Sequence, residues 1–115
     1  MPARHGRHAA TVAGAALLLA AAGALAQGGD AELALGRQVF VHKAQPACAL
    51  CHTLRDAGAE GQIGPVLDEL QPDAARVLKV LRSGFGAMPS FAGKLSEAEM
   101  AAVARYVATV TGAAR

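Results

Sequence analysis

Two thiols and an imidazole lie within one short run, Cys48-Ala49-Leu50-Cys51-His52. This spacing is the attachment signature of a c-type haem. Each cysteine can add to one vinyl group of the porphyrin as a thioether, and the histidine that follows is placed to bind the iron. Cys48, Cys51 and His52 are therefore predicted to hold one covalent haem c, with His52 as a metal ligand.

Other uses of this cysteine pair fit the sequence less well. A disulfide between Cys48 and Cys51 would close a very small loop and add little stability. A thioredoxin-like redox site needs a β-α-β context, and no strand pattern is visible around the motif. A zinc site would need a fourth ligand, and His42 is the only other histidine after the N-terminal segment.

The N-terminal segment has the layout of a secretory signal peptide. Residues 1–8 carry basic side chains, residues 9–23 are an unbroken run of Ala, Leu, Val, Gly and one Thr, and residues 24–26 supply the small residues of a cleavage site. An uncleaved anchor is the alternative, but a run of about fifteen apolar residues is short of the ~20 needed to span a bilayer. We therefore expect residues 1–26 to be removed, leaving residues 27–115 as a periplasmic domain without stable membrane insertion.

The length and charge of the chain limit the number of domains and the kinds of partner that it can have. A chain of 115 residues suffices for one domain. Lys and Arg number 11 against 9 Asp and Glu, but Arg4 and Arg7 belong to the leader, so the remaining domain is near neutral. Nothing in this balance indicates a nucleic-acid partner. Aromatic residues are scarce, with three Phe, one Tyr and no Trp, and a covalently held porphyrin would supply the missing apolar centre of so small a domain.

Three helices are predicted to position the motif, at residues 31–43, 72–83 and 95–111. In the first helix, Gly36 falls on the apolar face. A glycine there is expected where another helix crosses very closely, although it could also be only a weak point of the helix. Residues 53–63 contain glycines and no lasting periodicity, so they are predicted to form a loop beside the haem edge.

The last helix has clear end signals. Ser96 and Glu99 have the spacing of a capping box, with Ser96 as the N-cap. Gly112 is placed to end the helix, and Tyr106 belongs to its buried stripe.

Two further residues are candidates for the cofactor site. The carbonyl of Pro65 could accept a hydrogen bond from the second ring nitrogen of His52, which would fix the orientation of a metal-bound histidine; an ordinary turn proline is equally compatible with the spacing. Met88 lies in a glycine-rich segment and offers a soft thioether ligand. Met100 lies inside the last helix, where a core role is expected, so Met88 is predicted to be the second metal ligand.

In this order the residues resemble a small class I cytochrome c, and the match covers nearly all of residues 27–115. The resemblance implies an all-α fold in which the N- and C-terminal helices cross around one covalently bound haem. It also implies that His52 and Met88 are the axial ligands and that the Pro65 carbonyl is the partner of His52. The residues that carry it are Gly36, Phe40, Cys48-Ala49-Leu50-Cys51-His52, Gly64-Pro65-Val66-Leu67, Met88-Pro89, Val103 and Tyr106.

A narrower resemblance concerns the cytochromes that serve sulfite dehydrogenases. It is carried by Cys51-His52-Thr53-Leu54, Asp56-Ala57-Gly58-Ala59-Glu60-Gly61, Ile63-Gly64-Pro65 and Met88-Pro89-Ser90-Phe91. It implies a molybdenum sulfite dehydrogenase as the electron donor. The chain departs from the family at Val66, where Asn usually follows Gly-Pro, so the polar contacts of that side chain are not expected.

The expected function is single-electron transfer from that dehydrogenase to a downstream cytochrome or oxidase of the respiratory chain. With both axial positions filled, the chain is not expected to be an enzyme by itself, although it could be a permanent haem subunit of the dehydrogenase. The alternative is a haem-based sensor or peroxidase-like protein whose methionine ligand is displaced. The expected exchange surface is the haem edge, ringed by small and apolar residues, namely Ala47, Ala49, Leu50, Ala87 and Phe91.

Overall fold

The computed structural model describes residues 1–3, 5–6 and 28–114. Most of the predicted leader, residues 1–26, lies outside these residues, so its cleavage stays a prediction. Residues 28–38 are α-helical and lead directly into η1 (Val39–Lys43), a single turn of π-helix. The backbone N–H of Ala44 closes this turn on the Val39 carbonyl at 3.0 Å. The first predicted helix is therefore confirmed, with a widened last turn of a kind often found near functional sites.

The other two predicted helices are also confirmed. Helix α4 spans Ala74–Ser83, and Asp73 caps it by accepting a backbone N–H of its first turn at 2.7 Å. Helix α5 spans Glu97–Val110 and begins with the predicted capping box, in which Ser96 and Glu99 exchange hydrogen bonds of 3.0 Å. The backbone N–H of Ser96, which donates to the Glu99 carboxylate, is the main cause that lowers the pKa of Glu99, because it stabilises the charged form.

Several short elements were not expected. The segment predicted as a loop contains an antiparallel pair, β1 (Thr53–Leu54) and β2 (Ala59–Glu60). Two single-turn helices, α2 (Cys48–Cys51) and α3 (Leu67–Leu70), flank it. Elements of two or four residues are too short to show a hydrophobic period, so the sequence carried no signal for them. The fold is that of a helical domain with one minimal hairpin.

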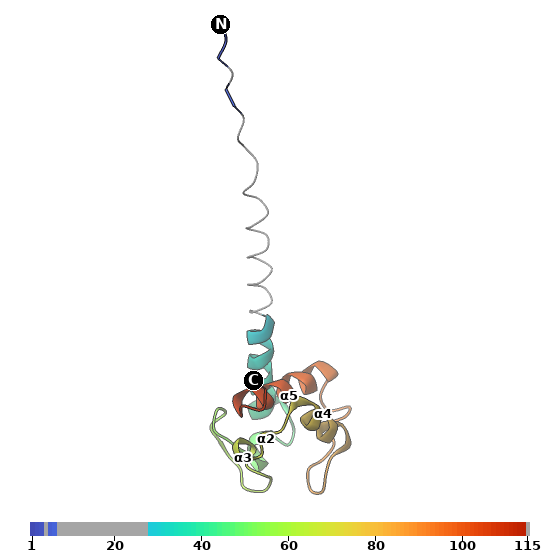
Figure 1. Cartoon of the computed structure of the whole chain (residues 1–115). Coiled ribbons are helices and arrows are strands. Elements are labelled where there is room, and N and C mark those ends of the chain that lie inside the picture. Colours follow the sequence, from blue (N-terminus) through green and yellow to red (C-terminus); the bar gives the residue numbers. More distant parts are fainter. Residues whose placement is uncertain (4, 7–27, 115) are drawn as a thin grey trace.

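The first helix and α5 cross in direct contact at Gly36 (Figure 1). A Cβ atom at this position would lie only 2.5 Å from the Cβ of Tyr106 and would also overlap the backbone of Ala102. One turn further on, the rings of Phe40 and Tyr106 meet edge to face, with centroids 6.3 Å apart and planes inclined by 63°. The close crossing predicted from Gly36 is confirmed, because any side chain there would force the helices apart.

Tyr106 also ties α5 to the hairpin. Its ring is only 2% exposed, and its hydroxyl donates a hydrogen bond to the carboxylate of Asp56 in the turn between β1 and β2. Burial, together with this carboxylate, raises the pKa of the tyrosine above its ordinary value. The phenol therefore stays protonated and keeps donating over the whole physiological pH range.

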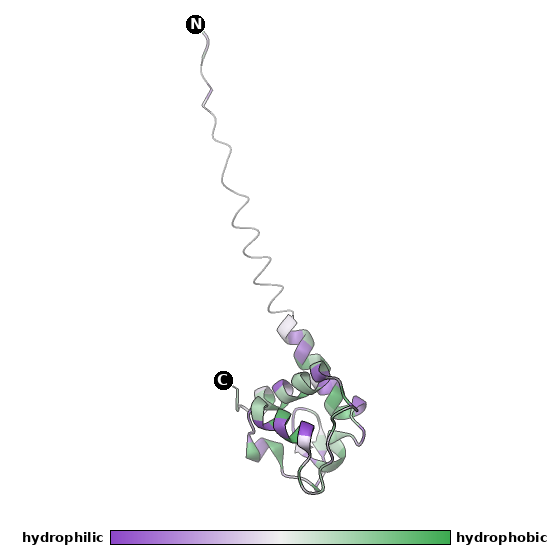
Figure 2. Ribbon diagram, turned by 90° about the vertical axis from the view of Figure 1, so that its right-hand side faces the viewer, coloured by the Kyte–Doolittle hydropathy of each residue, from purple (hydrophilic) through white to green (hydrophobic). Residues whose placement is uncertain are grey.

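Hydrophilic and hydrophobic residues alternate along the helices, as expected for helices with one buried face (Figure 2). The buried core gathers around the crossing, and its largest fully buried side chains are Phe40, Leu54, Leu81, Met100, Val39 and Val103. In the described part of the chain, no helix combines the length and the apolar character that traversing a bilayer requires.

Replacing Gly36 with Ala tests the crossing. The added methyl group has no room between the helices, so we expect the free energy of unfolding of the holoprotein to fall by about 1–3 kcal/mol. Gly29→Ala is the matched control, because a Cβ at Gly29 meets nothing within 4 Å; it should be neutral or stabilising by up to about 1 kcal/mol. Denaturant titration gives both values, and equal effects of the two substitutions would contradict the crossing.

Candidate cofactor-binding site

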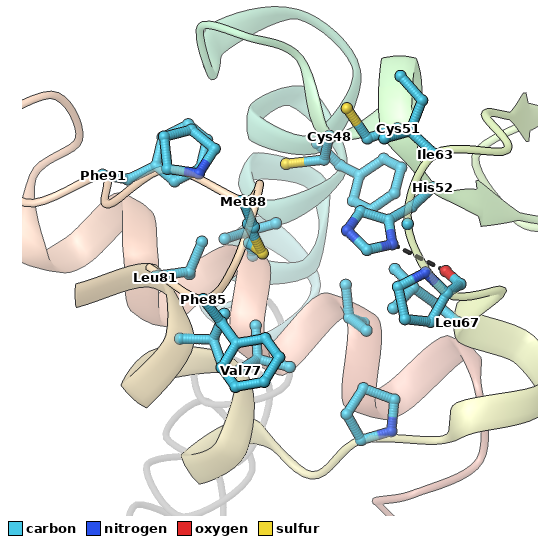
Figure 3. A pocket seen from close by; sticks show the side chains of 18 of the residues that line it. Cys48, Cys51, His52, Ile63, Leu67, Val77, Leu81, Phe85, Met88 and Phe91 are labelled. Carbon is cyan, nitrogen blue, oxygen red and sulfur yellow. Dashed lines mark hydrogen bonds between the residues drawn. The ribbon is translucent and has the colours of Figure 1, made fainter. Parts of the chain in front are cut away.

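One pocket of about 390 Å³ opens between the first helix, α2, α4 and the segment that carries Met88. Its walls are almost entirely apolar. Figure 3 shows the cysteines, His52 and Met88 turned toward the same space from different walls. All the residues predicted for the cofactor site line this pocket, namely Cys48, Cys51, His52, Pro65 and Met88.

The two cysteines lie at the ends of α2, one helical turn apart. Both are free thiols and both are half-buried. Burial raises the pKa of the Cys48 thiol to about 11, so this thiol is neutral at physiological pH. The helix ends at once, and the backbone N–H of His52 closes it on the Cys48 carbonyl at 2.9 Å. Among the described residues there is no group of three or more His, Cys, Asp or Glu side chains placed to hold a metal ion.

The ring of His52 is fixed by the backbone of Pro65. Its Nδ1 atom lies 2.8 Å from the Pro65 carbonyl oxygen. A carbonyl can only accept, so Nδ1 carries the proton and Nε2 keeps a free lone pair. This is the tautomer that a metal-binding histidine needs, and the same hydrogen bond fixes the orientation of the ring.

Two glycines whose contacts sequence reasoning missed bring this loop close to the motif. A Cβ at Gly64 would lie 2.5 Å from Cε1 of His52, and one at Gly61 would lie 2.6 Å from the carbonyl carbon of Cys51. The backbone N–H of Gly64 also donates to the Cys51 carbonyl at 2.6 Å. The glycine content of the segment indicated a loop, but only the structure shows which glycines touch the motif.

The segment that carries Met88 is held at both ends. Phe85 and Met88 pair through backbone hydrogen bonds of 3.0 and 2.9 Å around a tight turn. The Ser90 hydroxyl donates to a carbonyl of α4 at 2.6 Å, and the Phe91 N–H donates to the Leu81 carbonyl at 2.7 Å. Met88 is thereby presented to the pocket by a segment anchored on α4.

The other methionine of the domain is not at the site. Met100 is 2% exposed in α5 and does not line the pocket. Its predicted role as a core residue is confirmed.

The predicted rim of the pocket needs correction at three residues, because Phe91 is buried and neither Ala49 nor Leu50 lines the pocket. Phe91 is only 3% exposed and belongs to the core, because its backbone is tied to the end of α4. Phe85, at 79% exposure, is the phenylalanine at the mouth of the pocket, and Leu50 in α2 is 63% exposed. An irregular segment has no period to tell which of its two aromatic rings turns inward.

The chemistry of the lining residues fits a covalently bound haem. The walls are apolar, as a porphyrin face requires, and two unpaired thiols stand together at one end. An imidazole with a free Nε2 and a thioether sulfur supply one nitrogen and one soft ligand for iron.

Comparison with known proteins agrees with this chemistry. The family model described as cytochrome c oxidase, cbb3-type, subunit III matches residues 31–107. The chloroplastic cytochrome c6 of Chlamydomonas reinhardtii is 37% identical over an alignment of 106 residues that covers 81% of this chain, and the chain spans 63% of that protein's length. The crystal structure of the c-type cytochrome SorU from Sinorhizobium meliloti is similar with a TM-score of 0.68 and 50% identity, covering 72% of this chain and 94% of SorU.

Replacing Gly64 with Ala tests the support of His52. The new methyl group would push against the imidazole ring, so we expect covalent haem to be kept while the low-spin absorption spectrum weakens and carbon monoxide binds more readily. Gly58→Ala is the control, because Gly58 has a positive φ of 61° but open space around it. That substitution should cost about 1–2 kcal/mol of stability from backbone strain and leave the spectrum unchanged. If Gly64→Ala and Gly58→Ala had the same absorption spectrum, the contact between residue 64 and the His52 ring would be contradicted.

Proposed function

We propose a specific place in electron transfer for this chain, which belongs to the monohaem class I c-type cytochromes, carries one covalent haem c and transfers electrons. In this proposal it accepts electrons in the periplasm from a molybdenum sulfite dehydrogenase and passes them to the respiratory chain. In this proposal Cys48 and Cys51 hold the haem as thioethers. His52 and Met88 are its two axial ligands, and the Pro65 carbonyl holds His52 in place.

The convergence of His52 and Met88 on one apolar pocket carries this proposal (Figure 3). His52 presents Nε2 because Nδ1 is bonded to Pro65, and Met88 presents its sulfur from the other side. The haem, when bound, supplies an iron that alternates between Fe(II) and Fe(III). A nitrogen and a thioether sulfur favour a relatively high potential, and with both axial positions filled the iron has no position for a substrate.

The anchoring of the Met88 segment favours a carrier over a sensor or peroxidase. Displacing Met88 from the pocket would strain its paired bonds with Phe85 and the two bonds that tie residues 90 and 91 to α4. A displaceable ligand is expected on a segment with few such bonds. The observed segment is instead suited to keep the same ligand in both oxidation states.

The periplasmic location is supported by the leader-like residues 1–26, with their basic start, apolar run and Ala24-Leu25-Ala26. The donor is supported by the residue patterns shared with cytochromes that serve sulfite dehydrogenases, above all in the 56–65 loop and in Met88-Pro89-Ser90-Phe91. Of these shared residues, some line the pocket in the structure, namely Ile63, Gly64, Pro65, Met88, Pro89 and Phe91, whereas residues 56–61 do not.

The rim of the pocket is suited to short-lived encounters. Ile63 and Phe85 line the pocket and are 73% and 79% exposed, and Leu50, at 63% exposure, lies between the two cysteines of the motif. Apart from the leader, the chain is near neutral, so long-range electrostatic steering is expected to be weak. Small apolar contacts of this kind suit a redox encounter that must also dissociate quickly.

Met88→Leu tests the axial ligand. We expect the haem to stay covalently bound while the weak near-infrared band of a methionine–Fe(III) bond disappears and the reduction potential falls sharply, because the soft sulfur ligand is lost. Met100→Leu is the matched control and should change neither property, since Met100 lies in the core. A wild-type protein that is high-spin when oxidised and binds carbon monoxide readily would instead favour the sensor or peroxidase.

Reduction by a purified molybdenum sulfite dehydrogenase in the presence of sulfite tests the donor. We expect rapid reduction of the haem in stopped-flow absorbance, and none without sulfite. Leu50→Asp should slow the second-order rate about tenfold, which corresponds to ~1.4 kcal/mol. Thr109→Asp is the control, because it adds the same negative charge on the exposed face of α5. It should leave the second-order rate unchanged.

A failure of the dehydrogenase to reduce the wild-type protein would refute this donor while leaving the axial-ligand test intact. Co-elution of the two proteins in size-exclusion chromatography at high salt would favour a permanent subunit over a transient carrier.

A further inference from the structure

The C-terminal end of α4 is completed by the segment that carries Met88. The last carbonyl groups of a helix have no partner within the helix and must find one elsewhere. The Leu81 carbonyl accepts the backbone N–H of Phe91 at 2.7 Å. The Arg82 carbonyl accepts the hydroxyl of Ser90 at 2.6 Å. The second and third residues after Met88 therefore cap the helix that forms a wall of the pocket.

Gly84 allows the segment and the helix end to approach closely. It follows the last residue of α4 with a positive φ of 70°, and its N–H donates to the Val80 carbonyl at 2.7 Å. A Cβ atom at this position would lie 2.9 Å from the Met88 carbonyl oxygen and 3.0 Å from the Ser90 nitrogen. The backbone of residues 88–90 thus lies directly against the end of α4, so a movement of Met88 out of the pocket would separate the two.

Ser90 contributes the part of this connection that depends on residue type. Within residues 84–93 it is the only one with a hydroxyl, amide or charged side chain. Its hydroxyl donates to the Arg82 carbonyl and also accepts the backbone N–H of Ala92 at 3.2 Å. The bonds that pair residues 85 and 88, and the bond from residue 91 to α4, come from the backbone instead. Backbone groups are common to nearly all residue types, whereas the Ser90 bonds need a hydroxyl.

These bonds link the cap of α4 to the position of Met88. If Met88 leaves the iron together with its segment, the Ser90 hydroxyl is drawn away from the Arg82 carbonyl. A hydrogen bond that exists in only one of two states shifts their equilibrium toward that state. The Ser90 hydroxyl therefore favours the state in which Met88 lies in the pocket.

We propose that Ser90 is a positioning residue that keeps Met88 on the oxidised iron by holding its segment on the end of α4. This inference rests on the proposed axial ligation by Met88. A soft thioether binds Fe(III) less strongly than Fe(II). The oxidised protein is therefore the state in which the anchor of the segment matters most.

The test compares the oxidised holoproteins of the wild type, Ser90→Ala, Ser90→Thr and Ser83→Ala. The probe is imidazole, which competes with Met88 for Fe(III) and removes the near-infrared band of the methionine–Fe(III) bond. We expect Ser90→Ala to lower the apparent dissociation constant of imidazole about fivefold, the factor that one hydrogen bond contributes. Ser90→Thr keeps the hydroxyl and should stay close to the wild type.

Ser83→Ala is the matched control. Ser83 is the last residue of α4, and its hydroxyl bonds at 2.9 Å to the carbonyls of Lys79 and Gly84, within one turn of its own position. Both Ala variants lose bonds of one hydroxyl, so denaturant titration should show similar losses of stability. Only Ser90→Ala should bind imidazole more tightly, because only its hydroxyl belongs to the segment that moves with Met88.

Equal imidazole affinities of Ser90→Ala and Ser83→Ala would overturn the inference, and so would a Ser90→Thr variant that behaves like Ser90→Ala. Either result would leave the ligation by Met88 intact. A wild-type oxidised protein without the near-infrared band would instead refute that ligation itself, and with it the role of Ser90.

Discussion

The close approach of the 61–65 backbone to the end of α2 is the constraint on which the haem site depends. The Gly64 N–H holds the Cys51 carbonyl, and the next carbonyl, that of Pro65, holds the ring of His52. Two adjacent loop residues thus fix both the backbone and the side chain of one short motif. The approach is possible only because Gly61 and Gly64 lack side chains. A larger residue at either position would separate the imidazole from the atom that sets its tautomer.

The other wall of the pocket is set by helix packing. The Met88 segment is bonded to the end of α4, α4 packs on α5, and α5 crosses the first helix at Gly36. The separation of His52 and Met88 is therefore determined by elements far apart in the sequence. Changes at the crossing would act on the iron through geometry, although Gly36 itself does not line the pocket.

The difference between contacts within a few residues and contacts between distant elements explains what could be predicted from the sequence. The haem motif and the Ser96–Glu99 cap act over a few residues, and the burial of Gly36 follows from a helical period, so each left a readable pattern. The single-turn helices and the strands of the hairpin are too short to show a hydrophobic period. Phe91 was wrongly placed on the surface because irregular backbone carries no rule for side-chain direction. The contacts of Gly61 and Gly64 depend on a fold that returns the loop to the motif, which spacing alone does not reveal.

The pocket and the core are not separate in this domain. Phe40, Val103 and Val107 are each at most 2% exposed, yet all three line the pocket. One face of these side chains packs between the first helix and α5, and the other lines the pocket that would hold the haem. A covalent haem stays attached to the unfolded chain, but only in the folded state would its apolar surface be removed from water against these side chains, so it would add to the stability of the same helix crossing. A domain with four aromatic residues and no tryptophan can in this way complete its apolar centre with the cofactor that it uses for electron transfer.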